Sequence, residues 1–180
     1  LPFVISAAQR RTAPAEAPLP ETQTVFARYA DRIVKIHITE TGSGAKAELG
    51  TGFFVSDDGH VMTNYHVISK LVLHRDRYRA EIIDSAGGRH PITVLGVDVI
   101  NDLAVVKAGL LRAPFFRLEP LSLKQGTRLY SLGFPHDIGI TIVEGTYNGL
   151  MRSALYKKIH FTGSLNPGMS GGPAITANGN

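Results

Sequence analysis

The sequence predicts an all-β protein, and three features of its 180 residues lead to that expectation. Glycine occurs 19 times and proline 10 times, which interrupts the chain more often than a helical protein allows. Between these breaks stand short runs that are rich in β-branched residues and alternate apolar with polar positions. With 43% hydrophobic residues, the chain can bury a substantial core as one globular unit or as two tightly joined halves.

Residues 1–20 are expected to form a flexible arm or a signal-peptide remnant, followed by a linker. The apolar start leads into Ser6-Ala7-Ala8, a small-residue pattern typical of a cleavage site, which favours export over an ordinary docking arm. Thr12–Pro20 is rich in alanine and proline and lacks apolar periodicity, as an extended linker does. The folded unit is expected to begin at Glu21, with a short helix over Thr22–Ala30.

A first β-barrel is predicted over residues 21–110, because six short strands follow one another there. Two hairpin turns are the clearest signals: Ser56–Gly59 contains an Asp-Gly pair, and Ser85–Gly88 ends in Gly-Gly. The expected strands are Arg32–Thr39, Leu49–Val55, His60–Asn64, Tyr78–Asp84, His90–Val97 and Leu103–Ala108. Six antiparallel strands are enough to close a small barrel.

A second β-barrel is predicted over residues 111–180, after a connection between the two halves. Leu110–Gln125 is irregular and interrupted by proline, which is typical of such a connection. The strands expected beyond it are Thr127–Gly133, Ile138–Leu150, Tyr156–Thr162 and Pro173–Ala177. Four strands leave this second barrel incomplete at its C-terminal end.

Asn166–Pro173, which reads N-P-G-M-S-G-G-P, surrounds Ser170 with residues that permit tight turns. Such a turn can present a hydroxyl and several backbone N–H groups to one space, as an acyl-transfer nucleophile requires; a plain turn between strands is the alternative. The pattern also matches the G-x-S-x-G elbow of α/β-hydrolases, which needs a helix directly after the serine and a later histidine. Gly171-Gly172-Pro173 starts a helix poorly, and the last histidine, His160, precedes the serine. Any catalytic histidine and acid must therefore lie upstream.

His66 is the candidate base, because it stands after the apolar strand His60–Asn64 where the chain turns. A serine nucleophile needs a histidine to take its proton and a carboxylate to orient that histidine. Asp102, directly before an apolar strand, is the candidate acid, because a partly buried carboxylate needs hydrogen bonds or a positive charge. Asp98 is the alternative acid, and either aspartate could instead cap a turn.

Composition excludes several other classes of protein. The chain has no cysteine, hence no disulfide, and no apolar run of about 18 residues that would span a membrane. The net charge is +4, but the basic residues are dispersed except at His74–Arg79, so no nucleic-acid partner is expected. The histidines show neither H-x-x-x-H nor H-x-H spacing, so neither a metal nor another cofactor is expected.

Four sequence blocks carry these candidate residues in the order histidine, aspartate, serine. The blocks are T-G-F-F-V at 51–55, T-N-Y-H-V at 63–67, N-D-L-A-V-V-K at 101–107 and N-P-G-M-S-G-G-P at 166–173. Together they resemble the chymotrypsin-fold serine proteases, most closely the HtrA/Deg-like bacterial branch. The resemblance implies two antiparallel six-stranded β-barrels with the active site between them.

The same resemblance implies a serine endopeptidase that cleaves protein or peptide substrates through an acyl-enzyme intermediate and needs no cofactor. His66 is then the general base, Asp102 the orienting acid and Ser170 the nucleophile. The backbone amides of Gly168, Met169 and Ser170 would form the oxyanion hole. A degenerate protease-fold module that binds peptides or a partner without cleaving them is the alternative.

Ser164 is expected at the base of the specificity pocket, because the family places that position six residues before the nucleophile. An aspartate there would select Lys or Arg, whereas Ser164 is neutral, and Phe161 and Leu165 would add apolar walls. Cleavage is therefore expected after uncharged or aliphatic residues.

The sequence departs from the family pattern in four respects. Tyr65 stands where the family usually has a small residue, and Met169 where it commonly has Asn or Asp, although only the amide is needed there. The second barrel needs about two further strands after Ile175, and the 180 residues contain no PDZ domain, so the chain is expected either to be a fragment of a longer protein or to receive its missing strands from elsewhere. A periplasmic or secreted bacterial location is expected, and the oligomeric state is not predicted.

Overall fold

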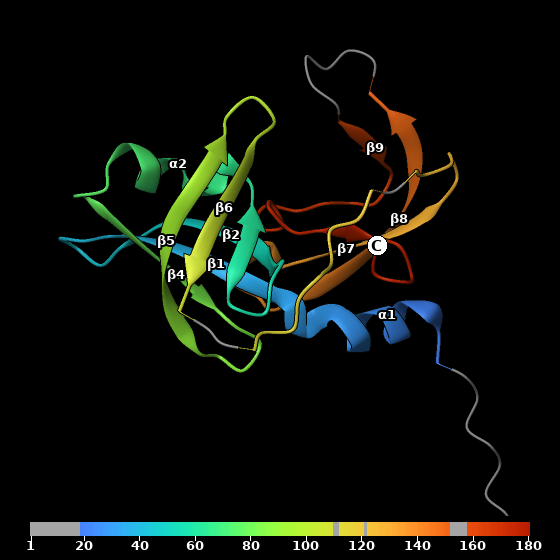
Figure 1. Cartoon of the computed structure of the whole chain (residues 1–180), viewed down its shortest axis with the longest axis horizontal. Coiled ribbons are helices and arrows are strands. Elements are labelled where there is room, and N and C mark those ends of the chain that lie inside the picture. Colours follow the sequence, from blue (N-terminus) through green and yellow to red (C-terminus); the bar gives the residue numbers. More distant parts are fainter. Residues whose placement is uncertain (1–18, 110–111, 121, 152–157) are drawn as a thin grey trace, which may run out of the picture.

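The structure is a computed structural model that describes residues 19–109, 112–120, 122–151 and 158–180. The expected cleavage pattern Ser6-Ala7-Ala8 and most of the expected arm lie outside these described residues. The expected boundary between the two halves, at residues 110 and 111, also lies outside them. In Figure 1 the chain forms a barrel on one side and a smaller sheet on the other.

The first half is a closed, six-stranded antiparallel barrel with the strand order β1-β2-β3-β6-β5-β4. Its strands are β1 (Ile33–Glu40), β2 (Lys46–Phe54), β3 (His60–Thr63), β4 (Tyr78–Ile83), β5 (Arg89–Asp98) and β6 (Leu103–Ala108). Alternate side chains of β1, Val34, Ile36 and Ile38, are fully buried in the barrel core. The six-stranded barrel expected in this half is confirmed, as are its two hairpins.

A helix, α2 (Tyr65–Leu73), follows β3 where the sequence indicated only a turn. Its buried residues Val67 and Ile68 pack against the barrel core. A Cβ atom at Gly50 of β2 would lie 2.3 Å from Val67 Cγ1, so glycine lets the helix approach the strand closely. The sequence analysis missed this helix because valine and isoleucine favour strands. Val67, Ile68 and Leu71 nevertheless recur at helical spacing.

The second half is an open sheet with the order β10-β7-β8-β9 among the described residues. Its strands are β7 (Arg128–Gly133), β8 (Thr141–Leu150), β9 (Ile159–Phe161) and β10 (Ala174–Ile175). All four expected strands are present, but β9 and β10 are only 3 and 2 residues long and each pairs with one neighbour. The described residues therefore form a four-stranded open sheet, in which the short edge strands do not pair with each other, and a complete second six-stranded barrel is not confirmed.

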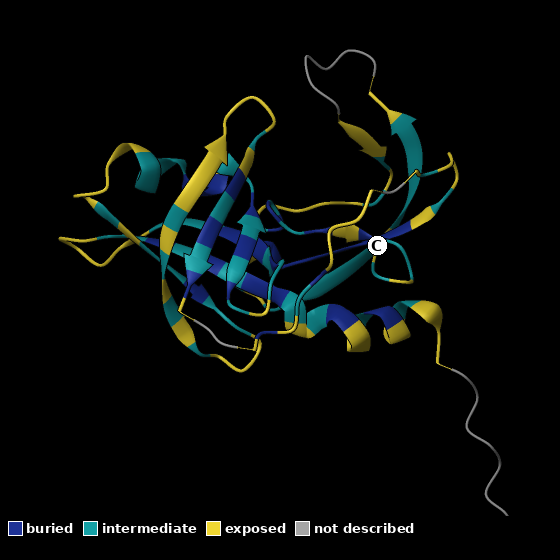
Figure 2. Cartoon of the chain, viewed as in Figure 1, coloured by how far each residue is buried: buried dark blue, intermediate teal, exposed yellow. Residues whose placement is uncertain are grey.

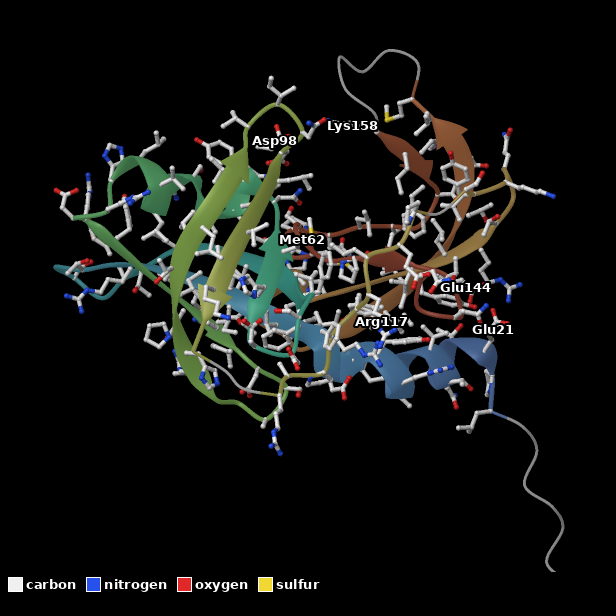
Figure 3. All side chains as sticks on the ribbon, viewed as in Figure 1. Glu21, Met62, Asp98, Arg117, Glu144 and Lys158 are labelled. Atoms are coloured by element: carbon white, nitrogen blue, oxygen red, sulfur yellow. The ribbon has the colours of Figure 1, made fainter. Side chains whose placement is uncertain are left out.

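The helix α1 (Glu21–Tyr29) and the 3-10 turn η1 (Ala30–Arg32) lead into β1, which confirms the helix expected over Thr22–Ala30. Figure 2 shows the buried stripe of α1 facing the rest of the molecule. A second core joins the helix to the open sheet; it contains Val25, Tyr29, Ile33, Phe116, Tyr130, Leu132, Phe134 and Ile175. Figure 3 shows Glu21 and Glu144 at this junction, where Arg128 forms ion pairs with both, at 3.4 and 3.2 Å.

Candidate active site

His66 and Asp102 are in direct contact at the end of the barrel. His66 is the second residue of α2, and Asp102 stands directly before β6. Asp102 Oδ2 lies 2.7 Å from His66 Nδ1, and Asp102 Oδ1 accepts a hydrogen bond of 2.9 Å from the backbone N–H of His66. The carboxylate therefore favours a proton on Nδ1, which leaves Nε2 of a neutral ring as the proton acceptor. The His66 side chain is 54% exposed, so solutes can reach that ring.

The backbone of Asp102 is also fixed from the barrel. Its φ is 55°, in the left-handed region that Asp and Asn tolerate better than most residues. The Asp102 carbonyl accepts hydrogen bonds from Asn64 Nδ2 at 2.7 Å and from the backbone N–H of Tyr65 at 3.2 Å. These bonds tie the turn before β6 to the start of α2, so His66 and Asp102 are held as one unit.

Asp98, the alternative acid, makes local contacts instead. Its carboxylate accepts hydrogen bonds from the side chain of Asn101 at 2.7 Å and from the backbone N–H of Asn101 at 3.0 Å. These hydrogen bonds hold the pKa of Asp98 below its usual value. Asp98 thus caps the turn between β5 and β6, and Figure 3 shows it at the tip of that hairpin.

Ser170 lies in a turn that packs against the barrel. The Ser170 carbonyl accepts a hydrogen bond of 2.8 Å from the backbone N–H of Thr51 in β2. Gly171 has a φ of +87°, and a Cβ atom there would lie 2.2 Å from the Thr51 carbonyl oxygen and 3.0 Å from the backbone N of Asn64. Only glycine fits this approach. It brings the residue after Ser170 against Asn64, two residues before His66.

No hydrogen bond joins Ser170 Oγ to His66 among the described residues. The three candidate catalytic residues are therefore only partly brought together: His66 and Asp102 are bonded, and Ser170 is held next to the same end of the barrel.

The three candidate oxyanion amides differ in what they bond. The backbone N–H of Met169 donates to the Asn166 carbonyl at 3.1 Å, inside the turn. Within the described chain, the N–H groups of Gly168 and Ser170 have no hydrogen-bond partner. Two of the three amides are thus free to bind an oxyanion, and the third stabilises the turn.

A pocket of about 570 Å³ opens beside the Ser170 turn. Phe161 and Leu165, two of the three residues expected to form the specificity pocket, line it together with Ser170. Ser164 is exposed and is not among the lining residues. The other lining residues are Asn64, Ser131, Ile159, Asn166, Pro167, Met169, Gly171, Gly172 and Ala174.

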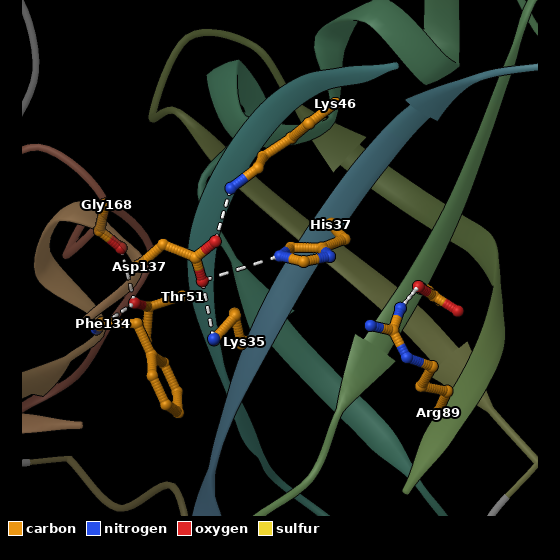
Figure 4. A network of polar contacts seen from close by, with 9 residues as sticks. Lys35, His37, Lys46, Thr51, Arg89, Phe134, Asp137 and Gly168 are labelled. Carbon is orange, nitrogen blue, oxygen red and sulfur yellow. Dashed lines mark hydrogen bonds and ion pairs between the residues drawn. The ribbon is translucent and has the colours of Figure 1, made fainter. Parts of the chain in front are cut away.

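Thr51 is a site residue that the sequence reasoning did not single out. Its hydroxyl donates to the Gly168 carbonyl at 2.7 Å and accepts from the Phe134 N–H at 3.0 Å, as Figure 4 shows. Its own carbonyl accepts a hydrogen bond of 2.7 Å from Thr63 Oγ1. Thr51 is the first residue of the T-G-F-F-V block, so the block could have pointed to it. A buried threonine in a strand, however, resembles any other core residue.

Two of the other histidines form local ion pairs within the barrel. His60 pairs with Asp58 at 2.7 Å, and His90 pairs with Asp84 at 2.8 Å. His160 is exposed on β9. Across the described ranges no group of His, Cys, Asp and Glu side chains is arranged to hold a metal ion, and no helix there is long and apolar enough to cross a membrane.

Comparison with known proteins adds independent information. The family model described as "Trypsin-like peptidase domain" matches residues 50–180. A probable periplasmic serine endoprotease DegP-like of Chlamydia pneumoniae is 31% identical over 146 residues, which are 78% of this chain and 29% of that protein. Protease Do-like 5, chloroplastic, of Arabidopsis thaliana is 29% identical over 160 residues, which are 79% of this chain and 49% of that protein.

Solved structures show the same likeness. The crystal structure of Deg5 has a TM-score of 0.75 at 27% identity, over 89% of this chain and 81% of that chain. The chain spans less than half the length of the two curated relatives above. These findings confirm the resemblance to the HtrA/Deg-like branch that the four sequence blocks indicated.

Proposed function

Because this chain belongs to the trypsin-like peptidase family, we propose that it is a serine endopeptidase domain that hydrolyses peptide bonds of protein substrates. The observation that carries the proposal is the bidentate contact of Asp102 with His66, which leaves the second ring nitrogen available as a base. The free N–H groups of Gly168 and Ser170 support it further, because acyl transfer requires donors for an oxyanion.

In the proposed reaction, Ser170 Oγ attacks the scissile carbonyl carbon while His66 Nε2 takes the hydroxyl proton. The carbonyl oxygen becomes an oxyanion that the N–H groups of Gly168 and Ser170 stabilise. The C–N bond then breaks, His66 returns the proton to the leaving amine, and an ester to Ser170 remains. Water, deprotonated by His66, attacks this ester, and the acid product and Ser170 are released.

We propose that cleavage follows uncharged or aliphatic residues. Phe161 and Leu165 present apolar surface to the pocket beside Ser170, and none of the described residues that line it is an aspartate or glutamate. A Lys or Arg side chain would lose its hydration there without gaining a charged partner. Profiling against a peptide library tests this point: predominant cleavage after Lys or Arg would contradict it.

A periplasmic or secreted location is part of the proposal. It rests on relatives whose names place them in the periplasm, such as the DegP-like protein of Chlamydia pneumoniae. Fractionation of cells that express the natural gene tests it, and recovery in the cytoplasm alone would contradict it.

Labelling with a fluorophosphonate probe tests the chemistry itself, because an activated serine displaces the fluoride of the probe and becomes phosphonylated. We expect the protein to be labelled and to digest unfolded casein, and Ser170→Ala and His66→Ala to abolish both with circular dichroism unchanged. Casein digestion by purified Ser170→Ala protein would refute the mechanism. An unlabelled wild-type protein that still bound peptides would instead favour a protease-fold module that binds without cleaving.

A further inference from the structure

We propose that Asp137 is a positioning residue for the oxyanion donor Gly168. Its carboxylate anchors the short segment Phe134–Asp137 of the second half to lysines of the barrel. That segment in turn holds the peptide between Pro167 and Gly168. This inference rests on the proposed function and assigns a role to a residue outside the triad.

The anchor is a cluster of charges between the two halves, shown in Figure 4. Asp137 Oδ1 accepts a hydrogen bond of 2.6 Å from Lys35 Nζ, and Oδ2 pairs with Lys46 Nζ. His37 Nε2 lies 3.8 Å from Oδ1. The side chains of Lys35 and His37 are 18% and 14% exposed, so this contact is better shielded than a typical surface ion pair. All three partners stand on β1 and β2 of the barrel.

The backbone of the anchored segment needs such support. His136 and Asp137 follow each other with φ values of 49° and 64°, and both lie in the left-handed region. Consecutive non-glycine residues rarely adopt this region unless the surrounding structure holds them there. The two lysines supply that hold through Asp137.

The supported segment contacts the Ser170 turn through one peptide group. The backbone N–H of His136 donates to the Pro167 carbonyl at 2.9 Å. No peptide bond in the described chain is cis, and across a trans peptide the C=O and the following N–H point in opposite directions. The bond from His136 therefore turns the N–H of Gly168 away from the segment, where it remains without a partner.

The packing around Gly168 makes this orientation sensitive to the position of the segment. A Cβ atom at Gly168 would lie 2.4 Å from the Phe134 carbonyl oxygen and 3.2 Å from the His136 N. A small movement of the segment would therefore push directly on the 167–168 peptide. Because Asp137 fixes the segment to the barrel that carries His66, it fixes the position of the Gly168 N–H relative to His66.

Asp137→Asn tests the proposal, since asparagine tolerates left-handed φ and keeps the size of the side chain, while it removes the charge and one of the two acceptor oxygens. The matched control is Asp58→Asn. Asp58 also pairs with a lysine and a histidine, at 2.6 and 2.7 Å, but all its partners belong to the barrel. The substrate is a succinylated tetrapeptide p-nitroanilide that ends in valine, and the transition-state probe is the matching peptidyl boronic acid.

We expect Asp137→Asn to lower kcat about 10- to 30-fold, less than the 10²- to 10³-fold that follows complete loss of an oxyanion donor. KM and the affinity for the corresponding product peptide should stay within about twofold, while boronate affinity falls in parallel with kcat. Asp58→Asn should change none of these quantities. Lys46→Met, which removes one of the two lysines on the barrel side, should give a smaller loss of the same pattern.

The outcomes separate this inference from the proposed function. Normal kcat and boronate affinity in folded Asp137→Asn protein, with an active wild type, would overturn the role of Asp137 and leave the endopeptidase proposal standing. An equal rise in KM for both aspartate variants would also overturn it. A wild-type protein that neither labels nor cleaves would contradict both.

Discussion

The half of the molecule that holds His66 and Asp102 is a closed barrel, whereas the half that holds Ser170 is an open sheet among the described residues. Every strand of the barrel has two neighbours, whereas in the described part of the second sheet β9 and β10 have one each. The base and the acid are bonded to each other within the barrel. The proposed nucleophile is held instead by bonds that cross from its turn to the barrel, through Thr51 above all.

This difference indicates that the barrel is a self-contained scaffold and that the Ser170 turn depends on it for its shape. Substitutions in the pair His66 and Asp102 should therefore lower activity without affecting folding. Substitutions at the contact between the Ser170 turn and the barrel should lower both activity and stability. The following predictions separate these two kinds of effect.

The largest effect is expected from Asp102→Asn. An amide in place of the carboxylate favours the wrong tautomer of His66, a change that lowers kcat about 10⁴-fold in trypsin-like triads. Asp98→Asn is the control, because Asp98 bonds only Asn101 and its neighbours, and it should cost far less. Steady-state kinetics with the valine p-nitroanilide measure both, and equal losses would show that the acid has been misassigned.

Gly171→Ala should damage folding as well as activity. The new Cβ atom would lie 2.2 Å from the Thr51 carbonyl oxygen, at a φ of +87° that alanine disfavours. We expect the free energy of unfolding to fall by about 2–4 kcal/mol. Gly96→Ala, which meets no atom within 4 Å, is the control. Urea unfolding followed by circular dichroism gives both values, and an undisturbed midpoint for Gly171→Ala would contradict the tight packing of the turn.

Thr51→Val should have a smaller effect of the same mixed kind. Valine keeps the volume but leaves the Gly168 carbonyl and the Phe134 N–H without their shared partner. Unsatisfied buried groups of this kind cost about 1–3 kcal/mol of stability. The exposed Thr93→Val should be nearly neutral. If the two valine variants unfolded at the same urea concentration, Thr51 would not be the bridge between the two halves.

The smallest effect is expected from acid on the Asp137 anchor. Hydrogen bonds from Lys35 and Lys46 hold the pKa of Asp137 well below its usual value. A lowered carboxyl pKa stabilises the fold above the unfolded pKa, and this contribution is lost as the pH falls through the folded pKa. The difference in unfolding free energy between wild type and Asp137→Asn should thus be present at pH 7 and shrink below about pH 4.

Burial lowers the pKa of His37, and the Asp137 carboxylate partly offsets this effect, so protonation of His37 costs more stability in Asp137→Asn than in wild type as the pH falls. The comparison is therefore made in a His37→Gln background, in which this ring does not titrate. Urea unfolding at pH 7, 5 and 3 measures it. A difference that grew towards pH 3 would have the wrong sign for a lowered carboxyl pKa.

The sequence by itself determined the parts of the protein that depend on neighbouring residues. Alternating apolar residues and Asp-Gly or Gly-Gly turns were sufficient for all six barrel strands and their hairpins. The candidate residues His66, Asp102 and Ser170 could be found because acyl transfer demands those residue types, and each stands in a short block with its own pattern.

Only the tertiary structure decided the rest, because it depends on close approaches and backbone hydrogen bonds, several of which join residues far apart in the chain. The helix over residues 65–73, where the sequence indicated only a turn, packs against β2 in the space that Gly50 leaves beside Val67. The different bonding of the Met169 and Gly168 amides depends on carbonyl groups of Asn166 and Pro167 and on a donor from His136. Every residue carries such backbone groups, so no side-chain pattern reveals which of them will meet.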